Sequence, residues 1–313
     1  MNKKVRYRGR FSQIGIYLGK FLRMFVYQSD WTVLPMAALI SSLVAYVVGA
    51  NINKTQEGTL TGCFAMVCVC VWNGFFNSIQ SVCRERSIVK REHRSGMHIS
   101  SYIAAHMIYQ TLLCLAQTVI LLFVCQQTGV FFPTAGLVTK YYLIDMGISM
   151  FLVTFAADML SLVISSIVHN TTTAMTMMPF MLIFQLVFSG GMFSLDGFAR
   201  KFSNVTITKW GLNSFCALGN YNNLPMVTLW NNIWKFRSME IDGQKPIKMM
   251  TNYIIKNNQL DELLLESGRY NMNPAYTATA ENVLHCWGVL IVMIFVFALL
   301  AMIILEFIDN DKR

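Results

Sequence analysis

Charge is scarce in this chain of 313 residues, because acidic and basic residues make up only 13% of it while hydrophobic residues make up 55%. A soluble globular domain usually carries about 25% charged residues. Charge is absent altogether from five long runs, at residues 31–53, 58–83, 95–139, 159–195 and 282–305. These runs exclude an ordinary soluble protein and indicate a membrane protein.

Motifs for catalysis and for nucleotide binding are also missing. The sequence has no GxxxxGK[ST] phosphate loop, no GxSxG and no HExxH, and none of its five histidines has another histidine four residues away. We therefore expect no catalytic residues, no metal site and no bound cofactor on this chain. Of the eight cysteines only Cys216 falls outside the expected spans and their edges, so no external intrachain disulfide is expected.

The uncharged runs predict six transmembrane helices, because a bilayer core of roughly 30 Å requires about 20 apolar helical residues. The 45-residue run at 95–139 supplies one helix and a loop. The six expected spans are residues 31–50, 59–82, 99–124, 142–168, 174–193 and 283–307.

Lysine and arginine are distributed unevenly between the two sides. Seven precede residue 31, five lie between residues 84 and 94, and two lie in the tail, whereas the short loops on the other side carry only Lys54 and Lys140. Cytoplasmic loops retain positive charge, so both termini are expected in the cytoplasm and the chain in the cell membrane. The net charge of +9 is then mostly an orientation signal, and no nucleic-acid partner is expected.

The pattern divides the chain into four parts. Residues 1–30 are a cytoplasmic N-terminus, 31–193 hold five spans, 194–282 form a large external loop, and 283–313 hold the last span and a tail. Within the first part, residues 11–28 mix apolar side chains with Lys20 and Arg23, which is typical of an amphipathic interfacial helix and not of a signal peptide. A solvated lead-in is the alternative. In the loop, residues 210–217 and 260–266 favour short helices.

The loop after the second span has the densest charge, with five cations and two acids between Arg84 and Arg94. Ile88 and Val89 lie among these charges, which favours a short helix at 84–97 that docks on a partner. A solvated loop that only sets the topology is an equal alternative on charge alone. Glu85 and Glu92 favour docking, because they share one helical face and suggest specific ion pairing.

The pattern ER-x(4)-RE-x(3)-GM-x(4)-Y, from Glu85 to Tyr102, resembles the coupling-helix signature of ABCG-like ABC transporter permeases. Residues 173–193, with Pro179 and the Phe-Ser-Gly-Gly run at 188–191, resemble the fifth helix of that family. The resemblance covers essentially the whole chain and is closest to bacterial members, which often carry an ATPase and sometimes a forkhead-associated domain. This chain shows neither.

The resemblance implies an exporter subunit that pairs with a second permease half, identical or homologous, and with an ATP-binding cassette ATPase on another polypeptide, which would hold ATP and Mg²⁺. It implies that two helices contact this ATPase: the coupling helix at 84–97, and the amphipathic helix at 11–28, which matches the connecting helix of the family. Lys20 and Arg23 of the connecting helix are expected to play a secondary part in this contact. The residues expected to transmit motion are Glu85, Arg86, Arg91, Glu92 and Arg94.

Polar and aromatic stripes inside the spans are candidates for a cargo path. The resemblance implies that the second and fifth spans line the cavity, whereas packing between helices is the alternative for each stripe. For Asp158, the one acid deep in a span, an internal pair ranks slightly above a cargo or proton role. The cavity candidates are Asn73, Phe76, Asn77, Gln80, Phe180, Phe184 and Phe188, and the intramembrane polar residues are Thr154, Asp158 and Ser161.

Two other functions remain open from the sequence. A secondary transporter or channel would normally show inverted repeats with broken helices in matching positions, and the single mid-span Pro179 does not favour one. A membrane scaffold would need no polar cavity.

Overall fold

The computed structural model describes residues 9–28, 30–191, 193, 195–241 and 243–307, and every regular element in these ranges is a helix. Five helices are long and apolar enough to cross a membrane. The chain is therefore an all-α polytopic membrane protein, as its sequence predicts. The five spanning helices lie at Asp30–Asn51, Gln56–Arg94, Ile99–Gln127, Tyr142–Ile167 and Ala280–Glu306.

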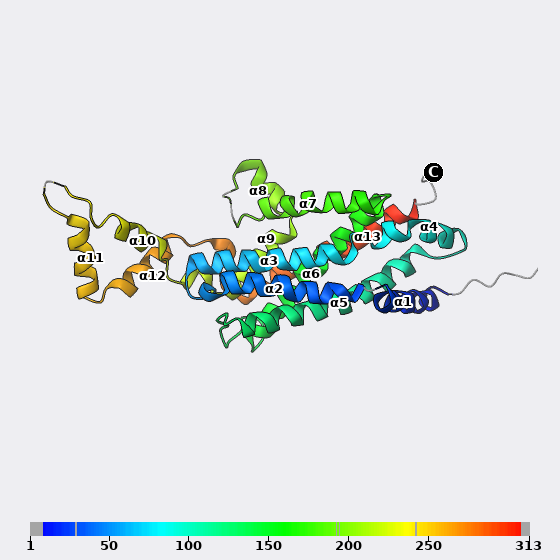
Figure 1. Ribbon diagram of the computed structural model, residues 1–313, viewed down its shortest axis with the longest axis horizontal. Coiled ribbons are helices and arrows are strands. Elements are labelled where there is room, and N and C mark those ends of the chain that lie inside the picture. The colour runs from blue at the N-terminus through cyan, green and yellow to red at the C-terminus, as the bar shows by residue number, and fades with distance from the viewer. Residues whose placement is uncertain (1–8, 29, 192, 194, 242, 308–313) are drawn as a thin grey trace, which may run out of the picture.

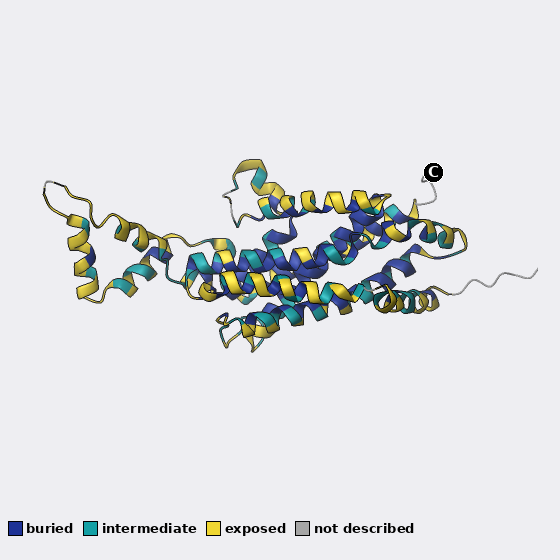
Figure 2. Ribbon diagram, viewed as in Figure 1, coloured by how far each residue is buried: buried dark blue, intermediate teal, exposed yellow. Residues whose placement is uncertain are grey.

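The spanning helices form an elongated bundle with α6 (Tyr142–Ile167) at its centre (Figure 1). α6 is the most buried of the five. Figure 2 shows exposed residues along the outer faces of α2 (Val33–Val48) and α7 (Thr171–Val187). These outer faces are apolar, as expected for helices that contact lipid. Two further helices surround α6, namely α5 (Ile99–Gln127) and α13 (Ala280–Glu306).

Close contact between α3 (Gln56–Ser78) and α6 depends on a glycine. A Cβ atom at Gly74 would collide with the carbonyl oxygen of Thr154 and with the side chain of Ala157. Small residues at a crossing let two helix backbones approach, which is a common basis of packing in membranes. Gly74 therefore fixes the crossing of α3 over α6.

α4 (Ser81–Arg94) continues α3 after a short break at Ile79 and Gln80. The hydroxyl oxygen of Ser165, on α6, accepts hydrogen bonds from the backbone N–H groups of Val82 and Cys83, at 3.1 and 3.2 Å. The helix expected at 84–97 thus begins at residue 81 and ends at 94, where Gly96 turns the chain with φ 101°.

The fifth span is expected at 174–193, but the helix found there, α7, begins earlier, at Thr171, and has only 17 residues. It contains Pro179 and ends before Phe188. Gly190 then adopts a left-handed conformation with φ 77°, which an α-helix cannot include. α7 is therefore a short apolar helix, below the roughly 20 residues that a straight span requires.

The amphipathic helix expected at 11–28 is α1 (Arg10–Tyr27). It lies beside α5 and close to α4, at the end of the bundle that we call the α4 end (Figure 1). Phe21 is buried and its ring meets the rings of Tyr102 and His106, with centroids 5.5 and 5.3 Å away. α1 thus belongs to the folded bundle and is not a solvated lead-in.

Residues 194–282 form two different structures. α9 (Ile207–Leu218), which includes the short helix expected at 210–217, is buried against α3, α6 and α13, and α8 (Gly197–Ser203) precedes it. α10, α11 and α12 project beyond the opposite end of the bundle and are largely exposed (Figures 1 and 2). We call this projection, residues 228–270, the arm; it contains α10 (Thr228–Lys235), α11 (Pro246–Lys256) and α12 (Leu260–Tyr270).

The first residues of α3 hold the base of the arm. The side-chain amide of Gln56 donates to the carbonyl oxygen of Gly268 at 2.9 Å. The Glu57 carboxylate accepts from the backbone N–H groups of Val227 and Thr228 at 3.0 and 2.7 Å. α3 is thereby joined to the arm at one end and to α4 at the other.

Candidate coupling site and membrane pocket

One face of α4 turns toward the bundle and carries an acid among apolar residues. Val82 and Val89 are fully buried, and Glu85 lies between them with 6% exposure. Lys20 of α1 places its Nζ 2.9 Å from the Glu85 carboxylate. An unpaired buried carboxylate is costly, so this ion pair allows an acid at an inward position of α4.

Three side chains of α1 contact α4 and the turn after it, and they follow one helical face at positions 13, 17 and 20. Gln13 is buried, donates to the carbonyl oxygen of Gly96 at 3.2 Å and accepts from the backbone N–H of His98 at 2.9 Å. The Tyr17 hydroxyl donates to the Glu92 carboxylate at 3.1 Å. Together with the Lys20 ion pair these contacts form what we call the clasp between α1 and α4.

The Tyr17 hydroxyl remains a donor at physiological pH. Burial, and then the neighbouring charge of Glu92, raise the pKa of Tyr17 well above its ordinary value of 10.0. The Glu92 carboxylate accepts the hydrogen bond that this hydroxyl donates. Tyr17 therefore keeps its phenolic donor for this hydrogen bond at neutral pH.

The outer face of α4 is basic and exposed. Arg84, Ser87, Arg91 and Arg94 are exposed at helical spacings of three, four and three. We call these four residues the basic stripe. Arg86 does not belong to it, because its guanidinium turns inward and donates to the carbonyl oxygen of Ser166 at 2.7 Å, at the end of α6.

The five residues expected to transmit motion therefore divide into two groups. Glu85, Arg86 and Glu92 hold α4 to α1 and α6, whereas Arg91 and Arg94 face outward. Helical spacing alone could have separated these groups, since Glu85 and Glu92 share the face of Val89. Gln13 and Tyr17 were not among the candidates, although their spacing with Lys20 is a stripe that the sequence displays.

The polar stripe of α3 takes part in packing and in a pocket. Asn77 and Gln117 exchange two amide hydrogen bonds of 2.9 Å between α3 and α5. Asn73 is buried one turn away, and Phe76 and Gln80 are partly exposed. Packing thus accounts for one role of Asn77, while Phe76, Asn77 and Gln80 also line the pocket described below.

The stripe of α6 is wholly buried. The Thr154 hydroxyl donates to the carbonyl oxygen of Met150 at 2.9 Å, and that of Ser161 donates to the carbonyl oxygen of Asp158 at 2.8 Å. Both carboxylate oxygens of Asp158 lie without a hydrogen-bond partner in the described part of the chain. The internal pair expected for Asp158 is therefore not found there.

The three phenylalanines expected in the fifth span do not share one environment. Phe184 and Phe188 pack on each other with ring centroids 4.9 Å apart, and both meet Phe202 of α8 at 5.7 Å. Phe180 is 66% exposed on the outer face. Two of the three residues thus form an aromatic cluster, and one faces away from the chain.

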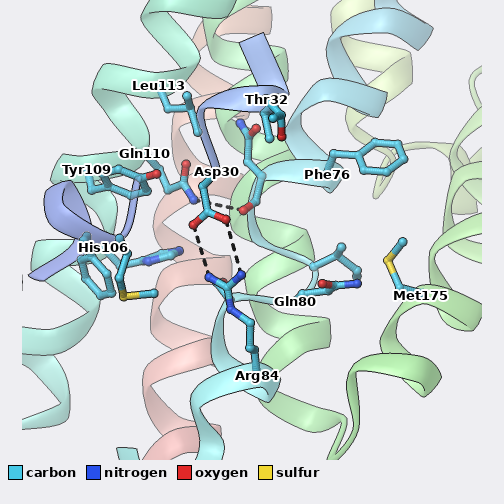
Figure 3. A pocket seen from close by; sticks show the side chains of 16 residues that line it. Asp30, Thr32, Phe76, Gln80, Arg84, His106, Tyr109, Gln110, Leu113 and Met175 are labelled. Carbon is cyan, nitrogen blue, oxygen red and sulfur yellow. Dashed lines mark hydrogen bonds and ion pairs between the residues drawn. The ribbon is translucent and has the colours of Figure 1, made fainter. Parts of the chain in front are cut away.

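A pocket of about 230 Å³ lies at the α4 end between α1, α3, α5 and the start of α2 (Figure 3). The Arg84 guanidinium binds the Asp30 carboxylate within it through two contacts, at 3.2 and 3.4 Å. Figure 3 shows His106, Tyr109 and Gln110 on one side of this ion pair, and Phe76, Gln80 and Met175 on the other. Apart from Phe76, Asn77 and Gln80, these residues were not expected from the sequence.

Comparisons with known proteins agree with this architecture. Residues 14–218, which run from α1 through α9, match the family model of the ABC-2 type transporter. Over 150 residues the chain is 29% identical to an ABC transporter ATP-binding/permease protein of Mycobacterium tuberculosis. That alignment covers 47% of this chain and 17% of the relative, so the chain spans about a sixth of that protein. The chain belongs to the ABC-2 type transporter family and is a membrane permease component.

Proposed function

We propose that this chain forms half of the translocation pathway of an ATP-driven exporter in the cell membrane, with the α4 end in the cytoplasm. A second permease half completes the pathway. A separate ATP-binding cassette ATPase, which holds ATP and Mg²⁺, docks on α4. The observation that carries the proposal is the division of α4 into an inward face fixed to the bundle and an outward basic stripe.

The inward contacts give α4 the means to move the membrane helices. The clasp joins α4 to α1, and Arg86 joins it to the end of α6. α4 also follows α3 directly in the chain, after the short break at Ile79 and Gln80. A partner that displaces α4 therefore displaces three parts of the bundle together. Closure of an ATPase dimer would favour one arrangement of the two permease halves over another, which is how a domain motion shifts a population.

The basic stripe supports the choice of partner. Arg84 is paired with Asp30, so Arg91 and Arg94 are the arginines of the stripe that would face the ATPase. Arginines can form bidentate hydrogen bonds with carboxylates, so the complementary surface on the ATPase would be acidic. ATP hydrolysis belongs to this partner, and the permease contributes the pathway and the docking helix.

The second half would face α3 and α7. An apolar cavity of about 600 Å³ lies on this side of the bundle, lined by residues of α2 and α3 and by Gly191 after α7. Phe180 and Ile183 of α7 are exposed on an outer face. A second copy or a homologous chain would cover these surfaces and enclose the cargo path between the halves.

Charge reversal on the stripe tests the docking proposal. We expect the double variant Arg91→Glu, Arg94→Glu to lose co-purification with the partner ATPase, and to lose ATP-driven transport. The matched control is Lys245→Glu, Lys248→Glu, which makes the same charge change at two exposed positions of the arm. Wild-type co-purification of the stripe variant, or equal loss in the control, would reject the proposed docking surface.

A further inference from the structure

In the orientation proposed above, the pocket at the α4 end would lie at the depth of the lipid headgroups. Asp30 begins the first spanning helix, and the amphipathic helix α1 contributes Phe21 and Met24 to the same walls. Helices of this type lie at the boundary between headgroups and acyl chains. A ligand in this pocket would therefore place its polar part among the headgroups.

The two charged residues of the pocket have opposite signs and face each other. The side chains of Asp30 and Arg84 are partly exposed, at 31% and 38%, so each keeps surface available to a ligand. Their charges sum to zero. A ligand with a net charge would introduce an uncompensated charge into a partly desolvated site, whereas a ligand with one charge of each sign would match both side chains.

Two buried polar atoms beside the ion pair have no hydrogen-bond partner among the described residues, although the side chains that carry them each contact Ser78 through another atom. Gln110 and His106 are each 1% exposed and line the pocket. The Gln110 Nε2 donates to Ser78, but its Oε1 has no hydrogen-bond partner in the described ranges, and neither has the Nδ1 of His106. Buried polar atoms are rarely left unpaired. An ammonium group provides three donors. The partly exposed Asp30 carboxylate can accept one, and a rotation of the Gln110 amide would bring its Oε1, which is closed to solvent in this structure, to a second.

Apolar side chains form part of the remaining lining, together with the polar residues Thr32, Asn77, Gln80 and Ser81. Phe21, Val33, Phe76, Leu113 and Met175 form the apolar walls. A cavity of about 230 Å³ is large enough for a compact headgroup, whose acyl chains would extend from the pocket into the bilayer. We propose that this pocket binds the zwitterionic headgroup of a membrane amphiphile, with a primary ammonium at Asp30 and Gln110 and a phosphate at Arg84. This binding is independent of whether the chain exports the amphiphile.

Binding to the full-length chain in detergent tests the proposal by calorimetry. The probes are dihexanoyl phosphatidylethanolamine, dihexanoyl phosphatidylglycerol and free phosphoethanolamine. We expect the first to bind about ten-fold more tightly than either of the others, the scale of one charge-assisted hydrogen bond. Equal affinity for the two lipids would overturn the zwitterion assignment. Equal affinity for free phosphoethanolamine would overturn the assignment to a membrane amphiphile.

Two tryptophan substitutions on α7 locate the site. Met175→Trp adds bulk at the pocket and should weaken phosphatidylethanolamine binding about ten-fold. Met177→Trp is the matched control, because Met177 is exposed to a similar extent, 41% against 39%, and does not line the pocket. The two variants should unfold at the same temperature. Unchanged binding by Met175→Trp, or equal weakening by both variants, would place the ligand elsewhere.

Asp30→Asn tests the ammonium contact separately. Losing the carboxylate should abolish the preference for phosphatidylethanolamine over phosphatidylglycerol, because Arg84 is then left to attract an anion alone. A preference that persists in this variant would contradict the proposed orientation of the headgroup.

Discussion

Removing Lys20 tests whether the ion pair between Lys20 and Glu85 contributes to the free energy of unfolding as much as a largely buried ion pair should. The Glu85 side chain is 8% exposed and that of Lys20 is 27% exposed, with 2.9 Å between the charged atoms. Deleting one partner of a fully buried pair costs about 3–5 kcal/mol, because the other charge remains without compensation. Lys20 is partly solvated, so we expect Lys20→Met to lower the free energy of unfolding by about 2 kcal/mol.

The double variant Lys20→Met, Glu85→Leu separates the ion pair from the other effects. Replacing both charges by apolar side chains leaves no unpaired group, so its stability should lie within about 1 kcal/mol of the wild type. The assay is unfolding of the purified chain in detergent by denaturant, followed by far-UV circular dichroism. With Glu85→Leu as the fourth member, these variants form a thermodynamic cycle.

An exposed ion pair supplies the control for burial. Arg269 and Glu266 approach to 2.6 Å on α12, but their side chains are 67% and 48% exposed. Arg269→Met should therefore change stability by less than about 1 kcal/mol, although this contact is the shorter of the two. The reasoning would be refuted if Lys20→Met were as stable as the wild type, or if the double variant lost the sum of the two single losses.

Three other changes test the packing, the coupling and the second half. Gly74→Ala should lower the free energy of unfolding by about 1–3 kcal/mol through its collision with α6, while Gly288→Ala, whose Cβ would meet nothing within 4 Å, should not; equal stability of the two would contradict the close contact. Glu92→Ala removes the acceptor of Tyr17, so it should insert normally yet transport less cargo per ATP hydrolysed, and normal transport would count against coupling through the clasp. Phe180→Cys should form an oxidative cross-link between two copies in the membrane if the second half is identical. Leu299→Cys on α13 should not, although Leu299 is exposed too, at 55%. Cross-linking of both variants or of neither would argue against α7 as the interface of a homodimer.

The elements that follow from local patterns were predictable from the sequence. The charge-free runs predict the spanning helices, because lipid excludes unpaired backbone groups and charges regardless of the rest of the fold. The spacing of apolar residues around Lys20 and Arg23 predicts α1. The end of α7 was only partly predictable, because residues 188–193 carry no charge but include the glycine pair at 190 and 191, which is a signal for the end of a helix. Gly190 has the left-handed backbone that this signal indicates.

The contacts of the site depend on pairs that are distant in the chain. Lys20 and Glu85 are separated by 65 positions, and Arg86 meets a carbonyl 80 positions away. A single sequence shows which residues share a helical face, but it does not show which other helix that face meets. For this reason the basic stripe and the inward acids appeared as one cluster, and the pocket around Asp30 and Arg84 did not appear.

If α3 and α4 tilt as one unit, their two ends move in opposite directions. The joined helices run for 39 residues, from Gln56 to Arg94, which is about 58 Å at 1.5 Å per residue. Gly74, which packs against α6, lies near the middle of this length and is the point about which such a tilt would turn. A tilt of about 5° would then move the two ends by about 2–3 Å in opposite directions. Because Gln56 and Glu57 hold the base of the arm, the proposed docking of a partner on the basic stripe would then also displace the arm at the far end of the molecule.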